Sequence, residues 1–221
     1  MNSETPISTQ SIPHSFLRFF IASATLFILL DTWKIEGLWM PALKALPILS
    51  LLIIAKIELG GTTQRFVIVA LSFSALGDIL LELQFAHHFI FGLGAFLIAQ
   101  LVYAAGFLRY AERLNRRSLA RVIPIALVTL ALGRVILPAS GGLAPAVLFY
   151  LLAIVAMAVA ASIHRGDSAL LFTGAVTFML SDTLIAINKF IAPLPFADSA
   201  IMLTYYGAQL AILYGIRRAQ A

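Results

Sequence analysis

The sequence predicts an all-α, polytopic membrane protein with eight transmembrane helices. Hydrophobic residues make up 61% of its 221 residues and charged residues only 11%, with a mean hydropathy of +0.98. A water-soluble domain exposes too much surface to hide that many apolar side chains. The apolar residues fall into eight long runs, without the alternating pattern of an outer-membrane barrel.

The first four predicted spans lie between polar or glycine-containing segments. A helix needs about 20 mostly apolar residues to cross a hydrocarbon core about 30 Å thick. Runs near that length follow the polar residues 1–14 and are separated by Lys34-Ile35-Glu36-Gly37 and Gly60-Gly61-Thr62-Thr63. The sequence therefore predicts spans at Phe16–Asp31, Leu38–Ile57, Arg65–Leu83 and Phe89–Tyr110.

Four further spans follow an arginine-rich segment, residues 109–121. Gly and Pro residues at 138–142 and 193–195 separate the later runs, which predict spans at Leu119–Leu137, Leu143–Ile163, Ser168–Asn188 and Ser199–Ile216. No clear cleavage site follows the first span, so we expect a retained helix rather than a signal peptide. Residues 1–14 are predicted to form a polar cytoplasmic segment, and residues 15–221 a single eight-helix transmembrane domain.

The basic residues are distributed unevenly between the two ends of the predicted bundle. Eight spans place both termini on one side with eleven of the fifteen Lys and Arg residues, and leave Lys34, Lys44, Arg134 and Lys189 on the other. Positive charge collects in cytoplasmic loops. We therefore expect a multi-pass protein of a bacterial inner membrane with both termini in the cytoplasm. This topology explains the net charge of +5 without a nucleic-acid partner, and favours lipid contact for the arginine-rich segment.

Two aspartates lie deep inside predicted spans. Asp78 lies in Leu-Gly-Asp-Ile-Leu-Leu-Glu-Leu and Asp182 in Leu-Ser-Asp-Thr-Leu-Ile-Ala, each 13 or 14 residues into a span that runs outward. A carboxylate at membrane depth is costly, so it usually faces a polar cavity and serves a function. Residues 74–78 and 178–182 are also weakly similar and lie four spans apart, which a parallel four-plus-four repeat would explain.

Further polar side chains are predicted at the same level of the bundle. Glu82 and Lys189 share helix faces with Asp78 and Asp182, four and seven residues further along. Because polar groups in lipid need partners, we expect these side chains to converge on one cavity that opens outward or sideways. The other candidate members are Lys44, Gln100, Arg134, Tyr205 and Gln209.

Simpler interpretations exist for several of these residues. Glu82 ends its span and could face the lipid headgroups, which the three basic side chains could also reach along their apolar stems. Tyr205 could belong to an aromatic belt at the membrane surface. The two aspartates could form a purely structural hydrogen-bonded pair.

The chain lacks the residues that several other kinds of catalysis need. The chain has no cysteine, which excludes thiolate nucleophiles and Cys-ligated metals. It has no Gly-x-Ser-x-Gly element, so Ser181 is interpreted as a packing or hydrogen-bonding residue. Its four histidines are divided between the two sides, so no three-histidine zinc site forms. We expect no cofactor and no metal, although Asp78, Glu82 and Asp182 leave a carboxylate metal site open.

Several of these elements together resemble the bacterial YhhN and animal TMEM86 family of membrane lysoplasmalogenases. The matching residues run from the second span to the last: Lys44-x2-Pro47, Ser74-Ala75-Leu76-Gly77-Asp78-Ile79-Leu80-Leu81-Glu82, Gly92-x3-Phe96-x3-Gln100-x2-Tyr103, Gly174-Ala175-x2-Phe178-x2-Ser181-Asp182-x2-Ile185-Ala186-x2-Lys189-Phe190 and Tyr205-Tyr206-x-Ala208-Gln209. The chain departs from the family at Gln100, where the family often has a histidine. Glutamine does not titrate, so only a hydrogen-bonding role is expected there.

The resemblance implies hydrolysis of the vinyl ether bond of a lysoplasmalogen, which releases a fatty aldehyde and a glycerophospho-ethanolamine or -choline. A vinyl ether is cleaved by protonation of its β-carbon, after which water captures the oxocarbenium ion. We expect Asp78 and Asp182 to supply the general acid and base, in an order that the sequence leaves open. Lys44, Lys189 or Arg134 would hold the phosphate. Tyr205 and Gln209 would orient water or the ether oxygen, and Glu82 and Gln100 complete the predicted substrate-binding set.

Two other classes of function fit part of the sequence. Intramembrane carboxylates and a parallel repeat also occur in transporters, so a small proton-coupled membrane transporter is the alternative. Against it, the segments around Asp78 and Asp182 lack Pro or Gly breaks apart from Gly77. A non-catalytic lipid-binding or assembly factor would not need two buried acids. The predicted partners are a lysophospholipid substrate and the lipid bilayer. The sequence does not predict whether the protein is a monomer or an oligomer.

Overall fold

The structure, a computed structural model, describes residues 14–165 and 169–220. This part of the chain contains eight helices that are long and apolar enough to cross a membrane, which confirms the predicted fold class. The ends of the predicted spans lie within four residues of the observed helix ends. The predicted polar segment 1–14 lies outside the described residues, apart from His14. The helices are α1 (His14–Thr32), α2 (Met40–Glu58), α3 (Gly61–Glu82), α4 (His88–Leu108), α5 (Arg116–Ala139), α6 (Ala144–Ser162), α7 (Ala169–Phe190) and α8 (Ala197–Gln220).

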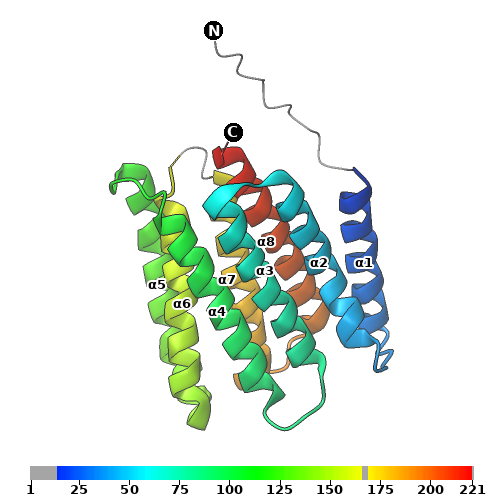
Figure 1. Ribbon diagram of the computed structural model, residues 1–221. Coiled ribbons are helices and arrows are strands. Elements are labelled where there is room, and N and C mark those ends of the chain that lie inside the picture. Colours follow the sequence, from blue (N-terminus) through cyan, green and yellow to red (C-terminus); the bar gives the residue numbers. More distant parts are fainter. Residues whose placement is uncertain (1–13, 166–168, 221) are drawn as a thin grey trace.

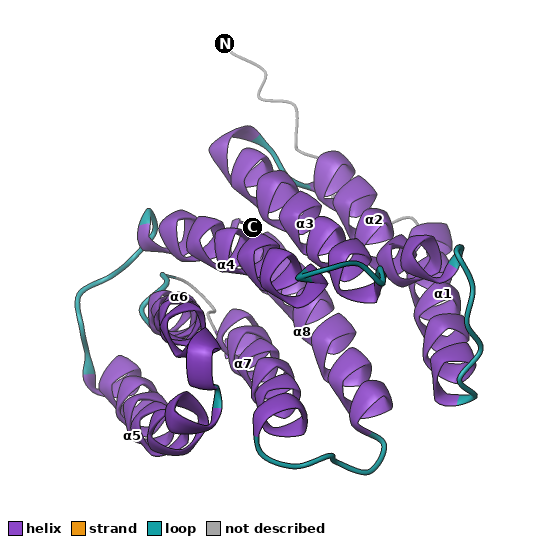
Figure 2. Cartoon of the chain, turned by 90° about the horizontal axis from the view of Figure 1, so that it is seen from below, coloured by secondary structure: helices purple, strands orange, loops and turns teal. Residues whose placement is uncertain are grey.

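The helices run alternately up and down, so that α8 ends on the side where α1 begins (Figure 1). Seven of them form a closed ring, because α1, α2, α3, α4, α6, α7 and α8 each pack on the next and α8 packs on α1. Helix α5 lies outside this ring, mainly against α6 (Figure 2). The ring brings α3 and α7, which carry the two aspartates, around one interior.

One predicted separator is shorter than expected. Residues 60–63 were predicted to form a loop, but α3 begins at Gly61, and only Leu59 and Gly60 join it to α2. Gly61 has a φ of +58°, a left-handed conformation that glycine adopts without steric cost. The chain therefore reverses direction in two residues, and α3 gains a further turn at its start.

Small residues let α7 and α8 approach closely. A Cβ atom on Gly174 would lie 2.8 Å from the backbone nitrogen of Ile212, and one on Gly215 would lie 2.5 Å from that of Leu171. Backbone contacts of this kind need glycine, which is common where membrane helices pack. This packing places Phe178 of α7 against Tyr205 of α8, with their ring centroids 5.5 Å apart.

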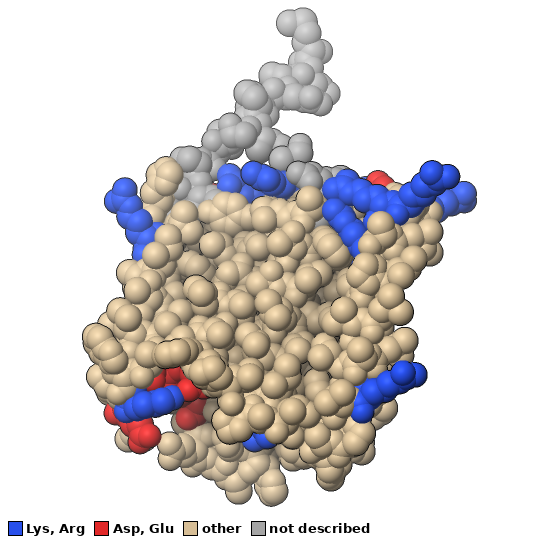
Figure 3. Space-filling model, turned by 180° about the vertical axis from the view of Figure 1, so that it is seen from behind, with Lys and Arg blue, Asp and Glu red and all other residues tan. Residues whose placement is uncertain are grey.

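Charged side chains differ between the two ends of the bundle. On the face shown in Figure 3, Lys and Arg gather at the end where α8 finishes, and most of the Asp and Glu side chains lie near the opposite end. This distribution agrees with the topology from which the cytoplasmic orientation was predicted. The orientation itself and the four-plus-four repeat remain predictions.

Single cysteines test the predicted orientation, since the chain has none of its own. Glu36 is exposed between α1 and α2, and Glu112 is exposed at the other end of the bundle between α4 and α5. In intact bacterial cells, a membrane-impermeant maleimide is expected to label Glu36→Cys at once and Glu112→Cys only after the membrane is permeabilised. The reverse order of labelling would place both termini outside the cytoplasm.

Candidate active site

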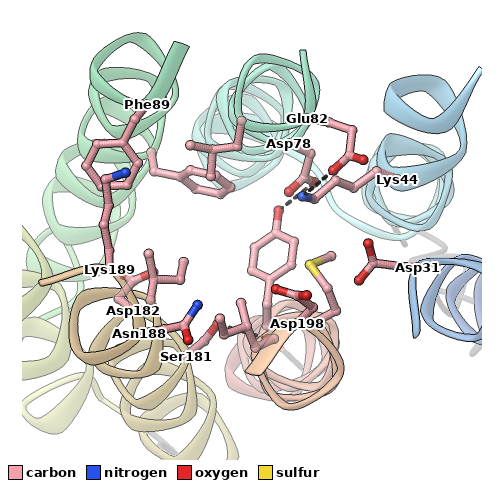
Figure 4. Close-up of a pocket in the computed structure, with 16 residues that line it drawn as sticks. Asp31, Lys44, Asp78, Glu82, Phe89, Ser181, Asp182, Asn188, Lys189 and Asp198 are labelled. Atoms are coloured by element: carbon pink, nitrogen blue, oxygen red, sulfur yellow. Dashed lines mark hydrogen bonds and ion pairs between the residues drawn. The ribbon is translucent and has the colours of Figure 1, made fainter. Parts of the chain in front are cut away.

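A cavity of about 570 Å³ lies inside the ring, toward the end opposite the C-terminus. Its polar lining comes from five helices and contains five carboxyl groups and two lysines (Figure 4). Six residues of the predicted set line it: Lys44, Asp78, Glu82, Asp182, Lys189 and Tyr205. The polar lining residues that the sequence did not single out are Asp31, Asn188 and Asp198, and Ser181 lines the cavity as well.

Asp78 is almost fully buried on α3, with 1% of its surface exposed. Its Oδ2 accepts a hydrogen bond of 2.9 Å from the hydroxyl of Tyr205 on α8. The Tyr205 ring is held edge-on by Phe96 and Phe178, each with its ring centroid 5.5 Å away. Tyr205 is therefore a buried partner of Asp78, and the aromatic-belt interpretation is wrong for this residue.

Asp182 has a different set of partners, at the junction of α4, α6 and α7. Its Oδ2 accepts hydrogen bonds of 2.8 Å from the Tyr150 hydroxyl and from Gln100 Nε2. Gln100 Nε2 also lies 2.8 Å from the Tyr150 hydroxyl, so the three groups form a closed triangle. Sequence reasoning missed Tyr150, which lies in a continuous apolar run with no polar neighbour to mark it.

The two aspartates are not directly hydrogen-bonded to each other. Each accepts from its own tyrosine, and they reach the cavity from different helices of the ring (Figure 4). This arrangement differs from the structural Asp–Asp pair that was considered for them. It leaves space between two carboxyl groups that a substrate and a water molecule could occupy.

Glu82 and Lys44 form an ion pair on the cavity wall. Lys44 Nζ lies 2.9 Å from Glu82 Oε2, and 13% and 22% of their side-chain surfaces are exposed. Glu82 therefore faces the cavity rather than the lipid headgroups. Because the pair is enclosed, removing either partner would leave the other charge poorly compensated.

Lys189 is the more accessible of the two cavity lysines. It is exposed, and its Nζ lies 4.2 Å from the ring centroid of Phe89. It has no carboxylate partner within 4.0 Å among residues 14–165 and 169–220. Arg134 does not line the cavity, because it is an exposed residue of α5, the helix outside the ring. Its predicted contact with the substrate phosphate is thus wrong.

The two predicted glutamines lie behind the cavity wall. Gln100 and Gln209 are fully buried, and neither is among the cavity-lining residues. Gln209 accepts a hydrogen bond of 2.9 Å from Tyr103 and donates one of 2.9 Å to Ser74. Both glutamines therefore hydrogen-bond to other side chains behind the wall, where contact with the substrate had been expected. Ser181 donates to the carbonyl of Ile201 at 3.0 Å, in agreement with its predicted hydrogen-bonding role.

An exposed salt bridge lies at the cavity rim. Lys34, in the loop after α1, lies 2.6 Å from Asp198 at the start of α8, and the hydrogen bond from Lys34 to this carboxylate raises the pKa of Lys34. Thr32 and Ser199 lie 2.7 Å apart beside it. Asp31 lies half-buried at the same rim and is not part of this ion pair.

The described residues contain no group of three His, Asp or Glu side chains arranged to hold a metal ion. Asp78, Glu82 and Asp182 all line the cavity, but each is engaged by a different donor. The site thus consists of carboxyl groups and hydrogen-bond donors, which are the groups that general acid–base catalysis uses.

Comparison with known proteins identifies the family. A model of the YhhN family matches residues 39–216, which include every cavity-lining residue from α2 onward. The chain belongs to the YhhN family. Both aspartates of this YhhN protein, and both of their tyrosine partners, lie within the matched region.

Curated relatives of this YhhN protein cover most of its length. Lysoplasmalogenase TMEM86B of Sus scrofa is 36% identical over 198 residues, which span 88% of this chain and 82% of the relative. Lysoplasmalogenase of Mycobacterium bovis is 32% identical over 180 residues, 79% of this chain and 69% of the relative. Lysoplasmalogenase TMEM86A of Bos taurus is 31% identical over 214 residues, 88% and 85% respectively. No solved structure matches the chain.

Proposed function

We propose that this protein is a membrane hydrolase that cleaves the vinyl ether bond of lysoplasmalogens. The products are a fatty aldehyde and a glycerophospho-ethanolamine or -choline. The proposal is carried by one observation: two separately held aspartates face a single cavity within the helix bundle. Three relatives that align with this chain over most of their length are each named lysoplasmalogenase, which supports the choice of substrate.

The reaction needs one acid and one base, with water as the only co-reactant. A neutral aspartic acid protonates the β-carbon of the vinyl ether, which turns the ether carbon into an oxocarbenium ion. The second aspartate takes a proton from water as the water adds to that carbon. The hemiacetal then collapses to an aldehyde and a free glycerol hydroxyl as its own hydroxyl proton passes to the leaving glycerol oxygen. The proton that the base took from water returns to the acid, which restores both carboxyl groups. No cofactor and no metal enters these steps.

The remaining polar side chains suit a zwitterionic headgroup. Lys189 is accessible and presents a cation at the mouth of the cavity, where it can pair with the phosphate. Lys44 stays with Glu82 and adds positive charge to the wall. Asp31 lies at the rim, outside the Lys34–Asp198 ion pair, and complements the ammonium group of an ethanolamine or choline headgroup. Gln100 and Gln209 act as positioning residues behind the wall.

The structure does not favour the transporter alternative. Helices α3 and α7 run without interruption through Asp78 and Asp182. Transporters of this kind usually place their binding sites at broken helices near the bilayer centre.

In the proposed orientation, in a bacterial inner membrane with cytoplasmic termini, the cavity opens toward the extracytoplasmic side, where a single-chain lipid can enter from the outer leaflet.

A set of three lysolipids with one headgroup tests the proposed function. We expect detergent-purified protein to release fatty aldehyde from the 1-alkenyl lysolipid and no product from its 1-alkyl counterpart, whose saturated ether cannot be protonated at carbon. The 1-acyl counterpart should release no fatty acid. Fatty-acid release from the acyl lipid would instead indicate an esterase, and substrate-dependent proton movement in liposomes without product would indicate the transporter.

A further inference from the structure

A second, narrow cavity adjoins the polar one. It has a volume of about 40 Å³ and lies between α3, α4, α6 and α7; we call it the side cavity. The two cavities are adjacent and share five lining residues: Leu81, Phe89, Phe96, Asp182 and Ile185. Leu93, Val147, Tyr150, Ala186 and Phe190 line the side cavity alone.

The side cavity differs chemically from the polar cavity. Its lining is hydrocarbon except for Asp182 and Tyr150, whose hydroxyl is already bound to Asp182. Asp78, in contrast, lines only the polar cavity. Asp182 is therefore the one carboxyl group, among the described residues, that lies on the boundary between the two cavities.

A lysoplasmalogen likewise consists of a polar part and an apolar part. Its headgroup and glycerol are polar, its alkenyl chain is apolar, and the vinyl ether joins them. We propose that the alkenyl chain occupies the side cavity, and that Asp182 is the acid that protonates the alkenyl carbon. This inference rests on the proposed function and assigns the two aspartates their separate roles.

The chemistry of each step follows from these positions. The carboxylic acid of Asp182 transfers its proton to the β-carbon, the first carbon beyond the ether carbon, while the double-bond electrons form the new C–H bond. Positive charge then develops on the ether carbon and oxygen. Water from the polar cavity adds to the ether carbon, and Asp78 accepts its proton. Tyr205, through its hydrogen bond to Asp78, is a positioning residue for this base.

The hydrogen bonds of Asp182 agree with its role as the acid. Tyr150 and Gln100 both donate to Oδ2. Oδ1 has no hydrogen-bond partner among residues 14–165 and 169–220, so it can carry the proton toward the substrate. When that proton has left, the same two donors stabilise the carboxylate that remains. Asp78 has one side-chain donor and borders the larger, polar cavity, which has room for water beside a substrate.

The side cavity is narrow, with room for little more than one water-sized group. A chain must therefore move side chains as it enters. Phe89 and Phe190 both line the side cavity and touch edge-to-face, with ring centroids 6.0 Å apart. Phe89 is the second residue of α4 and Phe190 ends α7, so separating the two rings widens the side cavity between these helices.

Filling the side cavity tests where the chain lies. Ala186→Phe adds a ring at its wall, and Ala156→Phe makes the same change at an exposed position of α6. For Ala186→Phe, kcat/KM with a hexadecenyl lysoplasmalogen should fall at least about tenfold, because each excluded methylene forfeits roughly fourfold in affinity. With a butenyl lysoplasmalogen it should change less than about threefold, and Ala156→Phe should leave both values unchanged.

The chain-length comparison has clear contrary outcomes. Equal losses on both substrates, or no loss on the long one, would overturn the placement of the chain. If wild-type protein cleaves neither substrate, the proposed function fails, and this inference fails with it. Should Ala186→Phe not fold, wild-type protein can be photolabelled with a 1-alkyl lysolipid carrying a diazirine near the ether. Labels on α4, α6 and α7 support the proposal, and labels confined to α1, α2 and α8 contradict it.

Deuterium exchange tests the assignment of the acid. In Asp78→Asn, protonation by Asp182 continues while capture of the ion by water is slowed, so the Asp182 carboxylate can remove the original β-hydrogen and regenerate the alkene. Substrate recovered from this variant in D₂O should therefore carry deuterium on the β-carbon, and substrate recovered from Asp182→Asn should carry none. Deuterium with Asp182→Asn would assign the acid to Asp78. Its absence from both would show that Asp78 is needed for protonation, which contradicts the assignment.

Discussion

Asp78→Asn and Asp182→Asn are each expected to reduce aldehyde release by roughly 10²–10⁴-fold, the usual contribution of general acid–base catalysis. Asparagine has almost the same shape as aspartate, and its amide oxygen can still accept the hydrogen bonds from Tyr205 and Tyr150, now 2.9 and 2.8 Å long. It can neither donate the acid proton nor take one from water. The measurement is kcat/KM with a 1-alkenyl lysolipid, on protein shown to be monodisperse and helical.

The control for these variants is the same chemical change elsewhere at this end of the bundle. Glu36 is exposed in the loop between α1 and α2 and is not among the cavity-lining residues, so Glu36→Gln should leave kcat/KM unchanged. Wild-type turnover by either folded aspartate variant would remove that residue from the proposed reaction.

Tyr150→Phe is expected to give the next largest effect. It deletes one of the two donors to Asp182 Oδ2 and keeps the ring that packs between α4 and α7. A hydrogen bond to a charged group contributes about 1.5–3 kcal/mol, which corresponds to roughly 10- to 150-fold in rate if the bond acts in the transition state. Because Tyr150 acts through Asp182, kcat should fall while KM changes little.

Tyr110→Phe separates this effect from general destabilisation. Tyr110 lies at the other end of the bundle, where its hydroxyl lies 2.9 Å from that of Thr63. The two variants lose the same group, so a loss of thermal stability can be compared directly. If Tyr150→Phe raised KM and left kcat unchanged, or if Tyr110→Phe lowered kcat equally, Tyr150 would not be a positioning residue for Asp182.

Sequence analysis could find the helices and six of the sixteen residues that line the cavity, for physical reasons. A spanning helix needs a run of about 20 apolar residues, so the position of each run in the sequence fixes the position of the helix to within a few residues. Lys44, Asp78, Glu82, Asp182, Lys189 and Tyr205 were expected to converge because isolated polar groups are unstable in lipid, and all six line the cavity. Asp78 and Asp182 were the clearest of these, since each lies inside an otherwise apolar run.

The remaining features depend on which helices touch, and the sequence carries no signal for that. Arg134 was expected in the cavity, but α5 lies outside the ring and carries it away. Tyr150 reaches Asp182 only because α6 packs between α4 and α7. Asp31 and Asp198 lie near the ends of their helices, where a charged residue usually marks the membrane surface, so their place at the cavity rim had no distinguishing pattern.

The position of a single deuterium atom tests the central claim most directly. If a carboxylic acid protonates the vinyl ether and water captures the ion, wild-type protein in D₂O should release aldehyde carrying one deuterium on the carbon next to the carbonyl. Authentic aldehyde incubated with the Asp182→Asn variant corrects for exchange after release. Aldehyde released without deuterium at that carbon would mean that the bond breaks without its protonation, which would contradict acid–base cleavage between Asp78 and Asp182.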